Sequence, residues 1–216
     1  MNSAINAEKI NKINNPDLSV VSWDRYLSGI KRYFQSGKDN VSRPYLLVRM
    51  YEQVVARDDF ANILIIDDKK DAVDNQFNYL LLGNKYTIMM RSFKTDKLFR
   101  ADFDLDASLT DLLRRYILEN KLTKYLFPNK KKDGPMKNLV EVVKNMNDKI
   151  PEFKKMTINT IRYSYISYYR KQHPNMTPRE NLSFSKRCFH SAETSSTYVR
   201  QIDPHSQFNP DSQMFH

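Results

Sequence analysis

Two short β-rich segments joined by a Gly-Asn turn place the strongest local constraint on this sequence. Tyr79–Leu82 and Tyr86–Met90 are rich in aromatic and aliphatic residues, and Gly83-Asn84 lies between them. Because Gly and Asn accept the backbone conformations of tight turns, the pattern predicts a β-hairpin. A third segment, Leu98–Leu105, alternates apolar and polar residues as a half-exposed strand does. The sequence therefore predicts a small antiparallel sheet in the middle of the chain.

Helical periodicity dominates on both sides of these segments. Apolar residues recur at helical spacing over residues 22–36, 45–56, 108–119, 136–146, 157–172, 182–189 and 194–200. The apolar run at residues 61–66 fits either a strand or a buried helix, because periodicity does not separate the two at this length. The predicted fold class is α+β and mostly helical, with helices surrounding the small antiparallel sheet.

The length of 216 residues suits one main domain with short appendages. We predict a flexible tail and a short N-terminal helical segment over residues 1–44, a main domain over 45–202 and a mobile tail over 203–216. The polar N-terminus lacks the apolar segment of a secretory signal. No apolar run approaches the roughly 20 residues that span a bilayer. These features predict an intracellular protein with no membrane partner.

The composition points to a polyanionic partner. Lys and Arg outnumber Asp and Glu by 35 to 25, which gives a net charge of +10, and the sequence pI is about 9.5. Nucleic acid is the first candidate, and a generic basic protein is the alternative. The single cysteine, Cys188, excludes a disulfide framework and a multi-cysteine zinc site. The four histidines lack metal-site spacing and the four glycines form no phosphate loop, so we expect neither a metal nor a cofactor.

The C-terminal third carries an ordered set of reactive residues. Arg162 lies in the helix that Thr157 caps, and Asn159 precedes it by three residues. His190 follows the next short helix, and Tyr198 lies eight residues further on. This order resembles the C-terminal signature of the tyrosine recombinases, the phage-integrase family.

The resemblance extends upstream and covers about residues 45–200. Arg57 opens a segment whose Leu64 and trailing Asp68 match the family's pattern around its first arginine. Lys94 lies, with Thr95, on the connection before the third strand, as the family's Lys-Thr pair does. Residues 125–128, Tyr-Leu-Phe-Pro, resemble the family's Leu-Phe segment after the following helix.

The resemblance implies a DNA breaking-rejoining enzyme, a site-specific recombinase or integrase that acts through a 3′-phosphotyrosyl intermediate without metal or ATP. Two guanidinium groups suit the phosphate oxygens, because they bind bidentately and stay charged. A lysine can protonate the 5′-oxygen that leaves, and a tyrosine can form the covalent intermediate. The catalytic residues that the resemblance implies are Arg57, Lys94, Asn159, Arg162, His190 and Tyr198.

The sequence departs from the family pattern at two positions. Asn159 stands where the family has a histidine, and an amide can donate to phosphate but cannot take the tyrosine's proton. Phe60 replaces the acidic partner of the first arginine, although Asp59 lies one residue earlier, and Arg49 is a rival for the role of Arg57. Two alternatives therefore stay open. One is a type IB topoisomerase-like enzyme, and the other is a catalytically inactive DNA-binding or DNA-packaging protein with the same fold.

The implied partner is double-stranded DNA, on which the family assembles as a homo-oligomer, a tetramer. Sequence-independent phosphate contacts are predicted at two lysine clusters, for which a solvated surface is the alternative. The clusters are Lys130, Lys131 and Lys132, and Lys154 and Lys155. The family's distribution favours a virus or mobile element as the source, which would place the protein in a host cytoplasm or nucleus, or in a virion.

Arg162 is predicted to lie near the positive end of a helix dipole, where an anion is favoured. Its helix carries enough apolar residues to be held by burial alone. We therefore expect the substitution Arg162→Lys to impair cleavage and to leave thermal stability unchanged.

Overall fold

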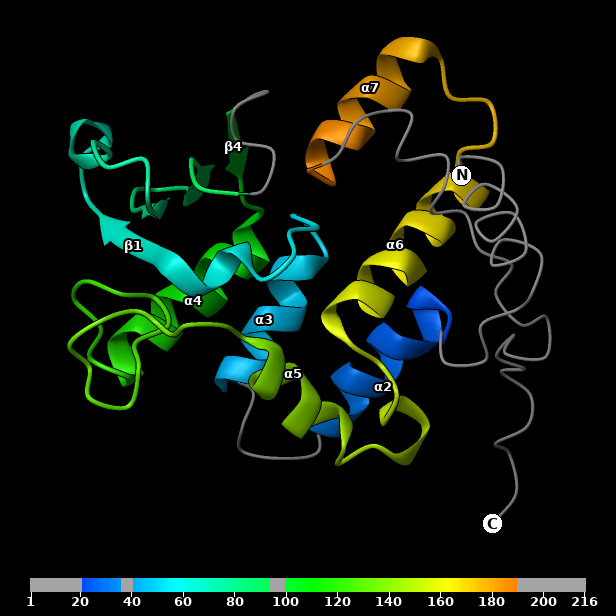
Figure 1. Ribbon diagram of the computed structural model, residues 1–216, viewed down its shortest axis with the longest axis horizontal. Coiled ribbons are helices and arrows are strands. Elements are labelled where there is room, and N and C mark those ends of the chain that lie inside the picture. Colours follow the sequence, from blue (N-terminus) through cyan, green and yellow to red (C-terminus); the bar gives the residue numbers. More distant parts are fainter. Residues whose placement is uncertain (1–20, 36–40, 94–99, 190–216) are drawn as a thin grey trace, which may run out of the picture.

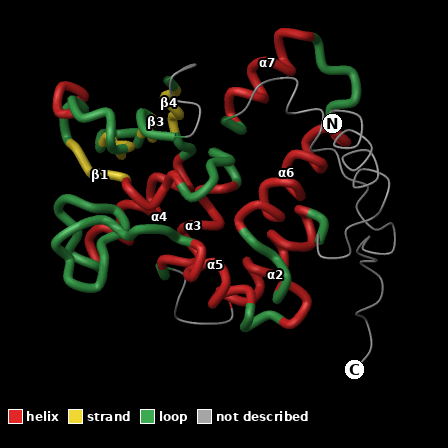
Figure 2. The backbone as a smooth tube through the Cα atoms, viewed as in Figure 1, coloured by secondary structure: helices red, strands yellow, loops and turns green. Residues whose placement is uncertain are grey.

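The computed structural model describes residues 21–35, 41–93 and 100–189 (Figure 1). The α-helices are α2 Trp23–Gln35, α3 Arg43–Tyr51, α4 Ala107–Glu119, α5 Val140–Asn147, α6 Ile158–Gln172 and α7 Pro178–Arg187. The strands are β1 Ile63–Ile66, β2 Asn78–Leu81, β3 Thr87–Met90 and β4 Ala101–Asp104. Three short 3₁₀ helices are η1 Asp59–Asn62, η2 Lys69–Asp71 and η3 Pro151–Phe153. Figure 2 shows the small sheet at the upper left, with the α-helices below it and to its right, and the predicted α+β class is confirmed.

The four strands form one sheet in the order β1-β2-β3-β4. The predicted hairpin is present, because β2 and β3 pair antiparallel, and β4 adds antiparallel to β3. The ambiguous apolar run becomes η1 followed by β1, which pairs parallel to β2 from Ile63↔Asn78 to Ile66↔Leu81. The sheet is therefore mixed rather than purely antiparallel, because residues 67–77 return the chain to the same end of the sheet.

Both outer strands of the sheet have specific neighbours. The backbone of residues 124–126 lies along β1, where Ile65 N donates to Lys124 O at 2.8 Å and Leu126 N donates to Ile63 O at 3.0 Å. On β4, Asp102 forms ion pairs with Arg91 at 2.6 Å and Lys69 at 3.0 Å.

One hydrophobic core joins the sheet to the helices. Leu80 and Ile88 face this core, whereas Tyr79 and Met89 pack on the opposite face of the sheet, as the period of two requires. Helix α3 packs against α2, α4 and α5, and α2 packs against α6. Figure 1 shows α3 between the sheet and the pair α2 and α6, with α7 beyond the end of α6.

The short N-terminal helix belongs to the same core as the rest. The Tyr26 hydroxyl donates to Asn147 Oδ1 at 3.0 Å, and Asn147 Nδ2 donates to Met156 O at 2.8 Å. The Trp23 ring meets the Tyr165 ring edge-on at 5.2 Å. Helix α2 is therefore fastened to α5 and to the start of α6, while the predicted division into domains stays a prediction.

Three predicted helices have different bounds in the structure. Helix α3 ends at Tyr51, and the apolar residues Val54 and Val55 are buried in a segment without regular secondary structure. Helix α5 covers only Val140–Asn147. Helix α7 begins at Pro178, four residues before the predicted start at residue 182, because Thr177 caps it and proline at the first helical position loses no hydrogen bond.

The remaining predictions on chain ends lie outside the described residues. These are the two tails and the helix at 194–200. Among the described helices, none is long and apolar enough to cross a membrane.

Gly29 of α2 offers a test of how η3 packs on this helix. A Cβ at position 29 would lie 2.4 Å from Cζ and 2.6 Å from Cε2 of Phe153, whose ring is fully buried. Overpacking costs about 1–3 kcal/mol, more than the roughly 1 kcal/mol that alanine adds in helix propensity. We expect Gly29→Ala to lower Tm in thermal denaturation, since about 1 kcal/mol shifts Tm by roughly 2–4 °C at this size.

Ser28→Ala is the matched control, because Ser28 is an exposed residue of the same helix. Its Tm should stay the same or rise slightly. An equal Tm for Gly29→Ala and the parent protein would contradict the close approach of Phe153.

Candidate active site

Arg162 lies in the protein interior and connects three chain segments. Helix α6 begins where predicted, because Thr157 and Thr160 form a reciprocal capping box. The Arg162 side chain is only 2% exposed. Its Nε donates to Val55 O at 3.1 Å and its Nη2 donates to Cys188 O at 2.7 Å. The guanidinium therefore joins α6 to the segment after α3 and to the end of α7.

Arg57 belongs to the segment that Arg162 binds. The Tyr51 hydroxyl donates to Arg57 O at 2.7 Å, and Arg57 N donates to Asp59 Oδ2 at 3.0 Å. These two bonds fix the Arg57 backbone at the junction of α3 and η1. Within the described residues, the half-buried Arg57 side chain makes no hydrogen bond or ion pair of its own.

Asp59 supplies the negative charge between the two arginines. Burial raises the pKa of the Asp59 carboxyl above its ordinary value of 3.8, and the Arg57 N–H and the charges of Arg162 and Arg57 oppose this rise. Phe60, at the family's acidic position, is fully buried, with its ring 5.4 Å from that of Tyr51. The acidic group near the arginines is thus one residue earlier than the family pattern implies.

Two phenylalanines bring further parts of the predicted site together. Phe93 immediately precedes Lys94, and Phe189 immediately precedes His190. Their rings meet edge to face, with centroids 4.9 Å apart, and both side chains are buried. The chain positions from which Lys94 and His190 continue are therefore in contact, although both residues lie outside the described ranges.

Phe189 adopts a backbone conformation that bulky residues rarely accept. Its φ is 55°, and it follows Cys188, the C-cap of α7. Glycine usually takes this position, so phenylalanine costs about 1–3 kcal/mol here. The rings of Phe93 and Phe103, at 4.9 and 5.7 Å, enclose the Phe189 ring and offset this cost. The aromatic contact and the helix end are therefore coupled.

A cavity of about 380 Å³ opens beside these segments. Residues from the Arg57 segment and from the β3–β4 connection form its walls, and the turn before α5 completes them. The lining residues are Asp58, Asp59, Ala61, Asn62, Ser92, Phe93, Met136 and Lys137. Burial also raises the pKa of Asp58, whose Oδ1 accepts the N–H of Leu139 at 2.5 Å.

The structure thus brings Arg57 and Arg162 together around Asp59. Asn159 lies in the first turn of α6 with an exposed side chain. Arg49, the rival of Arg57, forms an ion pair with Glu52 and also donates to the hydroxyls of Tyr45 and Ser108. Its charge is therefore already compensated. The predicted nucleophile, Tyr198, lies outside the described residues, as Lys94 and His190 do.

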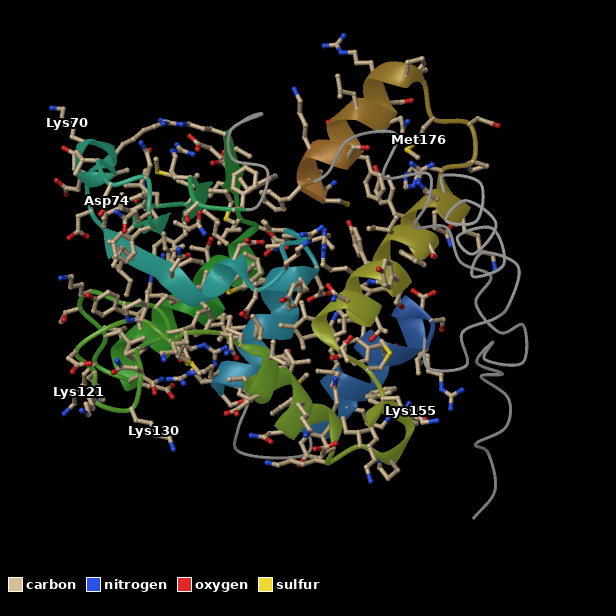
Figure 3. The ribbon with its side chains drawn as sticks, viewed as in Figure 1. Lys70, Asp74, Lys121, Lys130, Lys155 and Met176 are labelled. Carbon is tan, nitrogen blue, oxygen red and sulfur yellow. The ribbon has the colours of Figure 1, made fainter. Side chains whose placement is uncertain are left out.

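Both predicted lysine clusters are exposed. Lys130, Lys131 and Lys132 occupy the turn closed by the Pro128↔Pro135 bridge, and Lys154 and Lys155 lie between η3 and α6. Figure 3 shows Lys130 at the lower left and Lys155 at the lower right of the molecule, whereas α7 lies at the top. The two clusters do not form one patch.

The sequence analysis missed the roles of Phe93 and Phe189. The available signal was a phenylalanine directly before each of two predicted site residues. As for metals, the described ranges contain no group of three or more His, Cys, Asp or Glu that could hold an ion. Burial raises the pKa of the Cys188 thiol to about 12, so this thiol stays protonated near neutral pH.

The sequence and the structure were compared with those of known proteins. The sequence matches no established family profile and no curated protein. Among solved structures, it is similar to the XerH site-specific recombinase bound to its palindromic difH substrate in a post-cleavage complex. The TM-score is 0.55 and the identity 18%, over 87% of this chain and 49% of that chain. For the XerA recombinase the TM-score is 0.51 and the identity 16%, over 81% of this chain and 57% of that one.

The chain therefore has a tyrosine recombinase-like fold, as the resemblance in its sequence implied. It spans about half the length of these two proteins.

The two carbonyl contacts of Arg162 change the stability expected of Arg162→Lys. A lysine ammonium cannot reach Val55 O and Cys188 O with the geometry of a planar fork. Losing one bond from a charged donor costs about 1.5–3 kcal/mol, so we now expect a lower Tm by thermal denaturation. Arg114→Lys is the control, because the Arg114 side chain is 43% exposed and forms an ion pair with Asp111 on the same helix. Equal Tm values for Arg162→Lys and the parent protein would contradict the buried geometry.

Proposed function

We propose that this protein breaks and rejoins DNA as a site-specific tyrosine recombinase, through a 3′-phosphotyrosyl intermediate. One observation supports the proposal: the chain segments that carry Arg57 and Arg162, or that directly precede Lys94 and His190, are in contact with one another. Arg162 binds Val55 O, two residues before Arg57 in the sequence, and Cys188 O, two residues before His190. The Phe93–Phe189 contact adds the segment of Lys94.

The two arginines would stabilise the charge of the scissile phosphate. Arg57 has a half-buried side chain with no described partner, so its guanidinium can bind phosphate oxygens bidentately. Arg162 keeps its charge in the interior at any relevant pH and acts through the low local dielectric. Asp59 between them limits the repulsion of the two cations before DNA binds.

Cleavage would be a displacement at phosphorus. The Tyr198 phenolic oxygen attacks the phosphorus, the bond to the 5′-oxygen breaks, and the 5′-oxygen takes a proton from the Lys94 ammonium. The phenolic proton goes to water, because the amide of Asn159 cannot accept it. His190 donates a hydrogen bond to the phosphate. Rejoining reverses these steps when a 5′-hydroxyl attacks the phosphotyrosyl bond, so no external energy source is needed.

A second candidate is a DNA-binding protein that has kept the fold without the chemistry. Two observations favour it. Arg162 already donates hydrogen bonds to Val55 O and Cys188 O within the protein, and Asn159 lacks the proton-accepting ability of histidine. This candidate requires DNA binding alone. The recombinase would form a covalent adduct with DNA, whereas the inactive DNA-binding protein would not.

The partner in either case would be double-stranded DNA. The similar XerH structure is a complex with its difH substrate after cleavage. For this chain we propose assembly as a tetramer on DNA. The net charge of +10 favours binding to a polyanion.

The covalent intermediate can be trapped directly. We expect the protein to form an SDS-stable covalent adduct with nicked duplexes drawn from a randomised-sequence library. Cleavage close to a nick releases a short fragment that carries the 5′-hydroxyl. Once this fragment diffuses away, rejoining cannot occur and the adduct accumulates. The Tyr198→Phe variant should form none, since it lacks the nucleophilic oxygen. Gel electrophoresis of labelled DNA measures the adduct.

Tyr33→Phe is the control, because Tyr33 is an exposed tyrosine of α2, 40% accessible. Its adduct yield should equal that of the parent protein. An adduct that persists in Tyr198→Phe would remove Tyr198 from the role. Salt-sensitive DNA binding with no adduct in the parent protein would favour the inactive candidate.

The lysine clusters should contribute affinity without sequence preference. Replacing Lys130, Lys131 and Lys132 with glutamine should weaken binding to all duplexes alike. It should also reduce the slope of log K against log salt by about 0.9 per lost phosphate contact. Fluorescence anisotropy at several salt concentrations measures both. Lys70→Gln, on η2, is the control for one surface charge. An unchanged slope in the triple variant would identify the cluster as a solvated surface.

A further inference from the structure

Asn78 is a fully buried polar side chain at the first position of β2. In the sequence it ends a polar stretch, residues 67–78, that reads as a loop. A polar side chain with no access to water must find its partners within the protein, because an unpaired amide costs free energy. The partners of Asn78 therefore indicate what it holds.

The side-chain amide uses its full hydrogen-bonding capacity. Its Oδ1 accepts the backbone N–H groups of Arg91 at 2.8 Å and Ser92 at 2.9 Å. Its two N–H groups share three oxygens, namely Asp59 O at 2.7 Å, Asn62 Oδ1 at 2.9 Å and Ser92 O at 2.9 Å. Two acceptor and two donor functions are thus all satisfied.

These partners belong to two different segments of the candidate site. Asp59 lies two residues after Arg57, and Ser92 lies immediately before Phe93. Asp59, Asn62 and Ser92 also line the cavity of about 380 Å³. The Asn78 side chain therefore connects the wall formed by Asp59 and Asn62 to the wall formed by Ser92, although Asn78 itself does not line the cavity.

The sheet alone does not make this bridge. The ladder between β1 and β2 begins at Ile63↔Asn78, after η1, and the ladder between β3 and β4 ends at Met90↔Ala101, before Ser92. Asp59 and Ser92 both lie beyond the ladders. Without the amide, the backbone groups of Asp59, Arg91 and Ser92 would lose these partners in a partly buried site.

We infer that Asn78 is a positioning residue for the DNA cleavage proposed above. It acts through Asp59 and its neighbour Arg57, and does not touch the DNA. The bond to Asp59 O fixes the backbone on which Arg57 stands, and the three bonds to Ser92 and Arg91 hold the opposite wall. The inference rests on the proposed function and adds a residue that the family pattern does not include.

The direct test is Asn78→Asp, which keeps the shape and the two acceptor bonds but loses the donation to Asp59 O, Asn62 Oδ1 and Ser92 O. Asn147→Asp is a matched control. Asn147 is also fully buried, accepts one hydrogen bond from Tyr26 and donates one to Met156 O, away from the cavity. Both substitutions place a carboxylate against a backbone carbonyl in the core.

Single-turnover cleavage of a nicked duplex separates positioning from stability. A merely destabilised protein loses reaction amplitude at an unchanged rate constant, because fewer molecules are folded. We expect Asn78→Asp to keep most of its amplitude and to lose about 10²-fold in rate constant, the cost of a misplacement near 1 Å. Asn147→Asp should keep the rate constant of the parent protein. Equal rate constants for the two variants would overturn the inference.

Two further measurements keep the test decisive. If Asn78→Asp does not fold, Asn78→Ser replaces it, because one hydroxyl cannot span both segments, and the same loss of rate constant is expected. Amide hydrogen exchange needs no activity. Protection at residues 57–62 should fall in Asn78→Asp, which loses the bond to Asp59 O, and not in Asn147→Asp. Unchanged protection there overturns the inference, whereas a parent protein that never cleaves overturns the proposed function and leaves the exchange result to stand.

Discussion

The buried guanidinium of Arg162 is the interaction on which the rest of the site depends. It satisfies two backbone carbonyls that no secondary structure uses, Val55 O after α3 and Cys188 O at the end of α7. A carbonyl compensates only part of a full positive charge, so the interior needs a carboxylate nearby. Asp59 provides it, with a pKa that burial raises and the arginines lower. Removing the cation would leave the two carbonyls without this donor in the interior, and Asp59 would keep only the N–H and the charge of Arg57.

From this centre the contacts close into a ring. Arg162 holds the segment of Val55 and Arg57, Asn78 ties Asp59 of that segment to Ser92, and Phe93 meets Phe189 beside the carbonyl that Arg162 binds. Hydrogen bonds make three of these links, and the contact between Phe93 and Phe189 makes the fourth. A site held in this way needs little rearrangement when a charged ligand arrives, and such preorganisation is the main source of electrostatic stabilisation in enzymes.

Local signals explain what the sequence could predict. The Gly83-Asn84 turn and the Thr157 cap depend on neighbouring residues, and both the hairpin and the start of α6 are confirmed. The parallel pairing of β1 was not predictable from periodicity, because it depends on the path of residues 67–77. Arg162 was expected on a helix, but its burial depends on carbonyls 107 and 26 residues away in the chain. Asn78 ends the polar stretch of residues 67–78, and only its tertiary surroundings distinguish it from exposed loop residues.

The covering of the sheet edges limits how copies of this protein can associate. The backbone of residues 124–126 already occupies the outer hydrogen bonds of β1. On the other edge, β4 carries Asp102 and Asp104, which pair with lysine or arginine side chains, and an incoming strand would have to approach these charged groups. Neither edge therefore favours strand addition, the usual route to open-ended aggregates. Within the described residues, the helical surfaces and loops remain for an ordered assembly, and contacts there can be made and released without unpairing the sheet.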